Sequence, residues 1–232
     1  MKVKLLRYTA DAERLCGVAA LTTTKSGTPS EIFENMDSDT AKRIIRRVTG
    51  YGHGSVIEHA SFTFSIEGVS RAMTHQLVRH RIASYTQQSQ RYVEYNTLEN
   101  YVAPPSIADN PEAKKAFDET LKRISETYQR LLKMGIPKED ARFVLPNAAK
   151  TNIIVTMNAR ELRHFFNLRC CARAQWEMRE VATEMFKQVK NAAPALFENA
   201  GPSCVELGFC SEGKMKPPEC DIGKIKRRFT EL

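Results

Sequence analysis

Alternating apolar and polar residues predict strands at separate places along the chain. Between residues 59 and 67, Phe62, Phe64 and Ile66 alternate with serine, threonine and glutamate, which is typical of a strand with one buried face. Residues 2–8 show a weaker alternation, and residues 152–157 form a short run of strand length. We therefore expect a sheet built from strands that lie far apart in the sequence.

Apolar residues spaced by threes and fours predict helices between these strands. The longest should begin at Asn110 and Pro111, carry apolar residues as far as Leu132, and end at Gly135. The other predicted helices span residues 11–20, 38–50, 70–79, 137–143, 158–169 and 174–190. Because the chain shows no repeat and no clear linker, the pattern predicts one α+β domain.

Local signals mark the ends of these elements. Asp11 is expected to cap the first helix, and Ser38 or Asp39 to begin the second one, which Gly50 should end. The next residues, 53–55 (His-Gly-Ser), are expected to form a flexible loop, because glycine lets the backbone approach a ligand closely.

Composition narrows the class of protein. The 232-residue chain has room for one large domain or two small ones, and its 42% hydrophobic and 27% charged content is that of an ordinary soluble protein. A net charge of +8 favours an anionic partner: a nucleic acid, a nucleotide or another phosphate carrier. No apolar run approaches the length of a membrane span, and the N-terminus lacks the apolar segment of a signal peptide. We therefore expect a cytoplasmic protein without a membrane partner.

The C-terminal part is basic and rich in cysteine. Cys204, Cys210 and Cys220 could hold a metal, but their spacing is not that of a zinc finger and a fourth ligand is missing. A cytosolic compartment would keep these thiols reduced. We therefore expect no metal. The charged residues of the tail are expected to be solvated. They are Lys224, Lys226, Arg227 and Arg228.

The densest group of polar side chains lies between residues 51 and 92, which contain four of the five histidines. Arg79-His80-Arg81 stands at its centre, and Ser84, Ser89 and Arg91 follow at short intervals. Guanidinium groups bind phosphates bidentately, and hydroxyl groups add neutral donors. A basic helix end, stabilised by the helix dipole, would explain one of the arginines but not the serines. The pattern therefore favours a site for a planar, phosphorylated ligand.

Two histidines in this stretch, His53 and His59, raise the alternative of a metal site. Apart from Glu58, no cysteine or carboxylate lies at a conventional ligand spacing from them. They are also not one helical turn apart, as the histidines of a metalloprotease helix are. Metal ligation is therefore the weaker interpretation.

A second polar cluster occupies the predicted helix 158–169. Arg160, His164 and Asn167 follow one face at spacings of four and three. Arg169 falls roughly opposite Arg160 on an ideal helix. Either the helix ends before Arg169, or the two arginines serve different parts of a ligand, or they serve the sites of different subunits. An exposed helix with salt bridges is the alternative.

Together these residues resemble the flavin-dependent thymidylate synthases. The signature of that family is Arg-His-Arg, seven residues and then Ser, and it matches Arg79-His80-Arg81 followed by Ser89. The resemblance covers about residues 1–200. The other segments that carry it are Gln90-Arg91-Tyr92, His53-Gly54-Ser55, Glu58-His59, and residues 141–146, 158–169 and 175–177.

The resemblance implies a reductive methylation of dUMP to dTMP. Methylenetetrahydrofolate would be the carbon donor, and NADPH-reduced FAD the hydride source, with no nucleic acid as partner. It also implies a central, mostly antiparallel sheet flanked by helices, and a homotetramer with shared active sites. Residues 1–205 would form the synthase domain, and residues 206–232 a cysteine-containing basic tail. Since the family uses no cysteine nucleophile on the uracil, none of the six cysteines needs a catalytic role.

The resemblance assigns roles to individual positions. Arg169 matches the catalytic arginine that favours ionisation at N3 of the uracil, because a cation beside the ring stabilises negative charge developing on its oxygens. His53 matches a folate or nicotinamide contact. Gln87 stands where other members carry glutamate, so a carboxylate role is not assumed there. The positions that would hold FAD are Ser55, Arg79, His80, Arg81, Gln87, Asn158, Arg160 and His164. Those that would hold dUMP are Gln76, Arg79, Gln87, Gln88, Ser89, Gln90, Arg91, Arg142 and Arg169.

Two other functions remain open at the level of the residues. A basic nucleic-acid-binding protein would use Tyr85 and Tyr92 among the arginines, and would be colourless with a salt-sensitive affinity. A different flavoenzyme acting on another pyrimidine nucleotide would be yellow but would form no dTMP.

Overall fold

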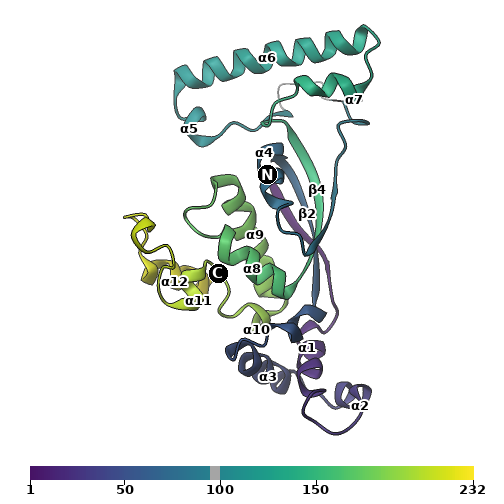
Figure 1. Cartoon of the computed structure of the whole chain (residues 1–232), viewed down its shortest axis with the longest axis vertical. Coiled ribbons are helices and arrows are strands. Elements are labelled where there is room, and N and C mark those ends of the chain that lie inside the picture. Colours follow the sequence, from purple (N-terminus) through teal and green to yellow (C-terminus); the bar gives the residue numbers. More distant parts are fainter. Residues whose placement is uncertain (95–99) are drawn as a thin grey trace. The chain divides into compact units, whose positions relative to one another are not determined.

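The computed structural model describes residues 1–94 and 100–232 and contains a four-stranded antiparallel sheet with the strand order β1-β2-β4-β3 (Figure 1). Its strands are β1 (Lys2–Tyr8), β2 (Ser61–Ser70), β3 (Ala83–Gln87) and β4 (Lys150–Asn158). The α+β class and the antiparallel sheet are therefore confirmed.

Helices fill most of the remaining chain. In chain order the α-helices are α1 (Ala12–Leu21), α2 (Pro29–Glu34), α3 (Ser38–Gly50), α4 (Arg71–Leu77), α5 (Pro105–Ala108), α6 (Pro111–Lys133), α7 (Lys138–Ala141), α8 (Ala159–Arg169), α9 (Trp176–Ala192), α10 (Pro194–Phe197), α11 (Ser203–Leu207) and α12 (Ile222–Glu231). Short 3-10 helices are η1 (Gly54–His59), η3 (Arg142–Val144) and η4 (Gly213–Met215). Among the described residues, no helix is long and apolar enough to cross a membrane.

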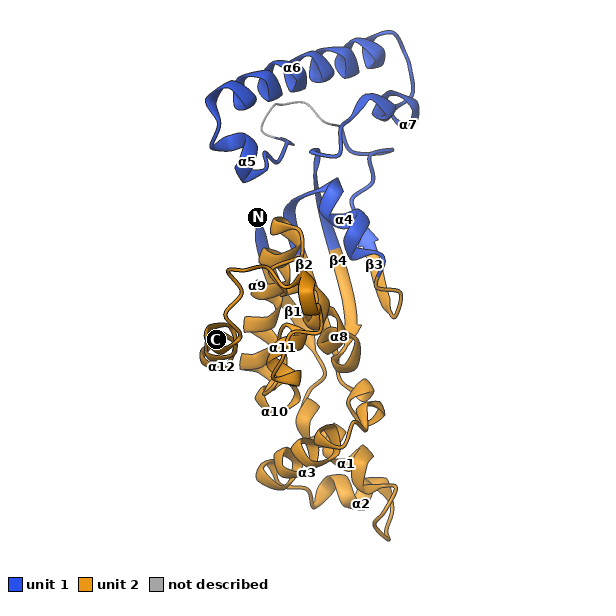
Figure 2. Ribbon diagram, turned by 60° about the vertical axis from the view of Figure 1, so that its left-hand side comes forward, with its two compact units in different colours: residues 1–2, 66–79, 86–153 blue, residues 3–65, 80–85, 154–232 orange. Residues whose placement is uncertain are grey.

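The chain divides into two compact units (Figure 2). Unit 1 comprises residues 1–2, 66–79 and 86–153, and unit 2 comprises residues 3–65, 80–85 and 154–232. Both β2 and β4 contribute residues to each unit. The predicted division at residue 205 stays a prediction.

The core of unit 2 is built on edge-to-face aromatic contacts between the sheet and its helices. Phe62 of β2 meets Phe197 of α10 at 5.4 Å between ring centroids, and Phe166 of α8 meets Phe186 of α9 at the same distance. All four rings are fully buried. Edge-to-face pairs add about 0.5–1.5 kcal/mol each beyond the burial of their area. Because this core fixes one side of α8, it also fixes where the polar side of that helix lies.

The opposite face of the sheet in unit 2 is open in the described chain. There Thr63 and Thr156 share a hydrogen bond of 2.9 Å, and Ile154 of β4 is 44% exposed. At the sheet edge, the Gln188 side chain of α9 accepts a hydrogen bond from the Leu5 N–H and donates one to the Val3 carbonyl. This pairing satisfies backbone groups that an edge strand would otherwise leave open.

Unit 1 is organised around α6. Asn110 accepts hydrogen bonds from the N–H groups of Glu112 and Ala113, Pro111 occupies the first helical position, and Gly135 has a φ of 84° just beyond the helix. The predicted start and end of this helix are confirmed. Its buried residues pack in a cluster with those of neighbouring segments. The cluster contains Tyr101, Leu121, Tyr128, Ala141 and Ala149.

Two local predictions near the N-terminus were wrong. Asp11 makes no side-chain cap and has a φ of 50°, so it turns the chain into α1 without capping it. Residues 53–55 do not form a flexible loop, since Gly54 and Ser55 begin the 3-10 helix η1. The predicted start of α3 at Ser38 and its end at Gly50 are confirmed, and Asp37 caps the helix by accepting from the Thr40 N–H.

Differences also occur around the Arg-His-Arg motif and at the C-terminus. Helix α4 ends at Leu77, so Arg79 lies in the turn beyond it, and Ser84 lies in the unpredicted strand β3 and not in a turn. The tail contains two unpredicted helices, and Phe229 of α12 is buried. The four C-terminal cations are exposed, as expected.

Candidate functional site

The exposed side of α8 borders a cavity of about 450 Å³ within unit 2. Asn158 caps the helix by accepting a hydrogen bond of 2.9 Å from the Glu161 N–H. The positive end of the helix dipole therefore lies at the cavity, which suits an anion, although the N–H groups of Ala159 and Glu161 already donate to the Ala60 carbonyl and the Asn158 side chain. The residues that line the cavity are Glu58, Ile82, Asn158, Arg160, Glu161 and His164.

Arg160 is held between η1 and the cavity. Its Nη1 pairs with Glu58 Oε1 at 2.6 Å. Its side chain also lies against Gly54, where a Cβ atom would stand 3.2 Å from Arg160 Nε. Glycine at this position thus gives the guanidinium group its room. Ser55 and His53 are exposed on the same short segment.

A buried network joins the Arg-His-Arg motif to both ends of α8. His80 Nδ1 lies 3.1 Å from Glu161 Oε1, and Arg169 Nε donates to His80 Nε2 at 3.0 Å. His80 and Glu161 are 5% and 6% exposed. The Tyr85 hydroxyl of β3 donates to the His80 carbonyl at 2.7 Å, which fixes the backbone of the motif. The His80 ring also packs edge-on against His164 at 5.8 Å.

The electrostatics of this network are set by burial. Burial and the neighbouring Arg169 and His164 lower the pKa of His80 to about 4, so its imidazole is neutral at pH 7. Burial raises the pKa of Glu161, and the charge of His164 partly opposes that rise. The pKa of Tyr85 is also raised by burial, so its hydroxyl stays a donor.

Within unit 1, the residues after β3 are tied to α4 and β4. The Gln87 amide donates to the hydroxyl groups of Thr74 at 2.9 Å and Thr151 at 3.3 Å. Arg71 Nη2 donates to the Gln88 carbonyl at 2.8 Å. Asn152 Nδ2 donates to Gln88 Oε1 at 3.1 Å. These contacts fix the backbone on which the predicted dUMP residues lie.

Two arginines of unit 1 meet at α7. Arg91 forms an ion pair of 2.7 Å with the Glu139 carboxylate, and Arg142 Nε donates to the Glu139 carbonyl at 3.1 Å. Ser89 Oγ accepts from the Arg91 N–H at 3.2 Å. Both guanidinium groups thus contact Glu139, while the Ser89 hydroxyl lies next to the backbone of Arg91.

The predicted residues therefore fall into two groups. Unit 2 brings together His80, Arg169, Asn158, Arg160 and His164, while Arg81 is exposed. Unit 1 holds Gln76, Arg79, Gln87, Gln88, Ser89, Gln90, Arg91 and Arg142. The predicted single face of α8 extends only to His164, because Asn167 instead donates to Glu206 of α11. Glu161 and Glu139 were not predicted as parts of a site, since carboxylates on helices usually form solvated pairs.

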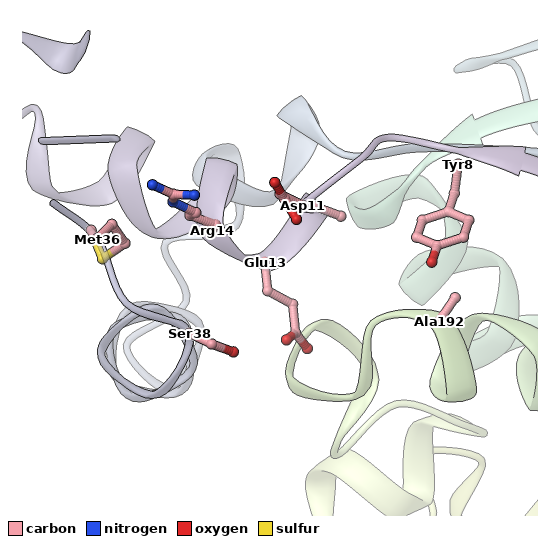
Figure 3. Close-up of a pocket in the computed structure, with 8 residues that line it drawn as sticks. Tyr8, Asp11, Glu13, Arg14, Met36, Ser38 and Ala192 are labelled. Carbon is pink, nitrogen blue, oxygen red and sulfur yellow. The ribbon is translucent and has the colours of Figure 1, made fainter. Parts of the chain in front are cut away.

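A second cavity, of about 340 Å³, lies near the start of α1 in unit 2 (Figure 3). Asp11, Glu13 and Arg14 contribute its charged groups, and Glu13 Oε1 accepts from the Ala195 N–H at 2.6 Å. Arg14 Nε donates to the Phe33 carbonyl at 2.9 Å. None of the predicted site residues lines this cavity.

The cysteine side chains are all free thiols. Burial and neighbouring thiols raise the pKa values of Cys204 and Cys220, which disfavours the thiolate that binds metals. In residues 1–94 and 100–232, no group of three or more His, Cys, Asp or Glu side chains is placed to hold a metal ion.

A cavity lined by Arg160 and His164 at the positive end of a helix is of the kind that receives an anionic ligand, as nucleotide- and cofactor-binding proteins do. Residues 4–195 match the family model of the thymidylate synthase complementing proteins. The flavin-dependent thymidylate synthase of Geobacter sulfurreducens is 47% identical over 234 residues, covering 100% of this chain and 99% of that protein. The chain belongs to the flavin-dependent thymidylate synthase family.

Solved structures show the same fold. The flavin-dependent thymidylate synthase ThyX of Helicobacter pylori, in complex with FAD and dUMP, has a TM-score of 0.70 and 27% identity, and covers 87% of this chain and 100% of that one. The UMP/dUMP methylase PolB of Streptomyces cacaoi, bound with 5-Br dUMP, has a TM-score of 0.69 and 26% identity, and covers 93% of this chain and 97% of that one.

Proposed function

We propose that this chain is a flavin-dependent thymidylate synthase that methylates dUMP to dTMP. Methylenetetrahydrofolate is the carbon donor, and NADPH-reduced FAD the hydride source. The observation that carries this function is the 47% identity with a named synthase over the full length of both chains. The chain also retains the family signature at Arg79-His80-Arg81 and Ser89.

The cavity at α8 fits FAD. Arg160 would offer its guanidinium group and His164 a ring nitrogen to the diphosphate at the positive end of α8, and Gly54 leaves room for Arg160. Bound FAD would supply the hydride that completes the methyl group. The chain's own residues would orient the cofactor there. Glu58 competes for Arg160 at 2.6 Å, so ligand binding must share or displace this carboxylate.

The dUMP phosphate is proposed to bind Arg91 and Arg142 beside Ser89, with the neighbouring glutamines and Arg79 completing the site. Arg169 is the proposed catalytic residue. Its cation would lie beside the pyrimidine and stabilise negative charge on the ring oxygens, which makes C5 nucleophilic. This chemistry requires no cysteine, and the raised pKa of Cys204 accords with that. His53 is proposed to contact the folate or the nicotinamide.

The assembly is proposed to be a cytoplasmic homotetramer whose active sites combine residues of several chains. Large apolar side chains support an extensive interface between copies, because they would otherwise face water. Ile82 is 69% exposed, Leu168 is 49% exposed, and Phe143 is 82% exposed.

The visible spectrum of the purified protein tests this function first. Added FAD should produce flavin absorption near ~450 nm that bleaches with NADPH, and dTMP should form when methylenetetrahydrofolate and dUMP are present. UMP should be offered in parallel, because a related methylase acts on both nucleotides. A colourless protein whose salt-sensitive affinity is for DNA or RNA would refute the proposal. Flavin reduction without dTMP would indicate a different flavoenzyme.

A further inference from the structure

The carboxylate of Glu161 has no place in the proposed chemistry, yet it is 6% exposed and lies against the signature histidine. Burying a carboxylate is unfavourable unless a donor pairs with it. The donor here is the Nδ1 side of His80, at 3.1 Å. The other side of the ring, Nε2, receives the Nε–H of Arg169 at 3.0 Å. A carboxylate, an imidazole and a guanidinium group therefore form one chain of hydrogen bonds.

The donors and acceptors of this chain can be arranged in only one way. An arginine side chain has no acceptor and keeps its protons, so His80 Nε2 must present a lone pair to Arg169. Because the His80 ring is neutral at pH 7, its one proton must then sit on Nδ1 and point at Glu161. If Glu161 donated a proton to Nδ1, His80 would carry its proton on Nε2 and would repel the Arg169 N–H.

We propose that Glu161 is a positioning residue, which selects the Nδ1–H tautomer of His80 and thereby aims the Arg169 guanidinium group. This inference rests on the proposed function of Arg169. The charged or titratable groups that face the pair are Arg169 and His164 of α8, Tyr85 of β3, and Glu58 across the cavity. Arg169 bonds to the imidazole ring itself, and Tyr85 bonds to the His80 carbonyl.

Two replacements test this role in the FAD-loaded enzyme. Glu161→Met keeps the volume but offers no acceptor, whereas Glu161→Gln keeps the shape and an amide oxygen that can still accept from Nδ1–H. Glu177→Met is the matched control, because Glu177 is also a buried carboxylate in the first turn of a helix. At saturating FAD, we expect kcat for dTMP formation to fall about ten- to a hundredfold in Glu161→Met, as when outer partners of a reactive group are removed. Glu161→Gln should retain more of the wild-type kcat than Glu161→Met, and the control should keep its kcat.

The tautomer itself is a second readout that needs no turnover. ¹⁵N shifts of histidine-labelled protein should show a neutral, Nδ1-protonated ring in the wild type, and its signal should be identified by its loss in His80→Gln. In Glu161→Met, which leaves the Nδ1–H without an acceptor, the proton should move to Nε2 and the hydrogen bond from Arg169 should be lost. A wild-type ring that is charged or protonated on Nε2 would overturn the inference, and so would wild-type kcat in Glu161→Met. Wild-type enzyme that holds FAD but forms no dTMP would overturn the proposed function, and the inference with it.

Discussion

The guanidinium group of Arg160 lies against the backbone of Gly54, and this contact shows how a residue without a side chain sets the site. A Cβ at Gly54 would stand 3.2 Å from Nε and 3.4 Å from Cδ of Arg160. Both atoms belong to a flexible side chain that is free to shift. The backbone of Gly54 has an ordinary negative φ, so its role is to leave room and not to turn the chain.

Replacement of Gly54 by alanine should therefore displace Arg160 without unfolding the protein. We expect FAD affinity to fall about tenfold, since a misaligned guanidinium group loses roughly 1.4 kcal/mol of charge-assisted hydrogen bonding. The free energy of unfolding should change by less than about 1 kcal/mol. Titration with FAD, followed by flavin fluorescence, measures the first quantity. Gly50→Ala is the control, because its Cβ would meet nothing within 4 Å. Equal FAD affinity in the two variants would contradict the role of Gly54.

At the scale of elements, the sequence predicts the helices and strands whose own residues show a clear pattern of apolar and polar positions. Helix α8 was predictable because Asn158 caps it and because Phe165 and Phe166 mark its buried side. Strand β3 was not, since its sequence ASYTQ is polar on both faces and lies at the edge of the sheet. Helix α2 was missed for its brevity, although Thr28 and Glu31 form a capping box. The contacts within the site could not be predicted either, because His80 and Glu161 are 81 positions apart and meet only through tertiary packing.

Helix α12 is the clearest case of an element that packing defines. Phe229 is 3% exposed, and its ring lies 5.1 Å from that of Phe186 of α9. Gly201, with a φ of 145°, approaches so closely that a Cβ there would stand 3.0 Å from the Phe229 ring. Lys190 of α9 donates to the carbonyls of Phe229 and Thr230 at 2.7 Å each. Helix α12 is therefore anchored to the core of unit 2 through Phe229.

Removal of the Phe229 ring should destabilise the whole protein. Phe229→Ala is expected to lower the free energy of unfolding by about 3 kcal/mol, from lost burial and the cavity left behind. Arg227→Ala, at an exposed position of the same helix, should change it by no more than about 0.5 kcal/mol. Urea unfolding followed by circular dichroism measures both. Equal stability of the two variants would mean that α12 does not stabilise the core.

At the scale of the whole molecule, the two predicted ligand sets divide between the two units. The FAD set lies mainly in unit 2 with Arg169, while most of the dUMP set lies in unit 1. If each active site is formed by a single chain, that chain must provide the FAD residues of unit 2 and the dUMP residues of unit 1. In the proposed tetramer, unit 1 of one chain would serve unit 2 of another. The two alternatives predict different activities when chains with a substitution in unit 1 are mixed with chains that carry one in unit 2.

Complementation between inactive variants separates these alternatives. Arg91→Ala removes a proposed dUMP contact in unit 1, and Arg169→Ala removes the proposed catalytic cation in unit 2. When they are co-expressed with two different tags and purified through both, shared sites would restore activity, because some sites receive an intact unit from each chain. Random assembly would give about a quarter of the wild-type sites. The control pair, Arg91→Ala with Arg142→Ala, should stay inactive, since both arginines contact Glu139 of the same unit. If the first mixture were as inactive as its parents, each chain would have to build its active site from its own two units.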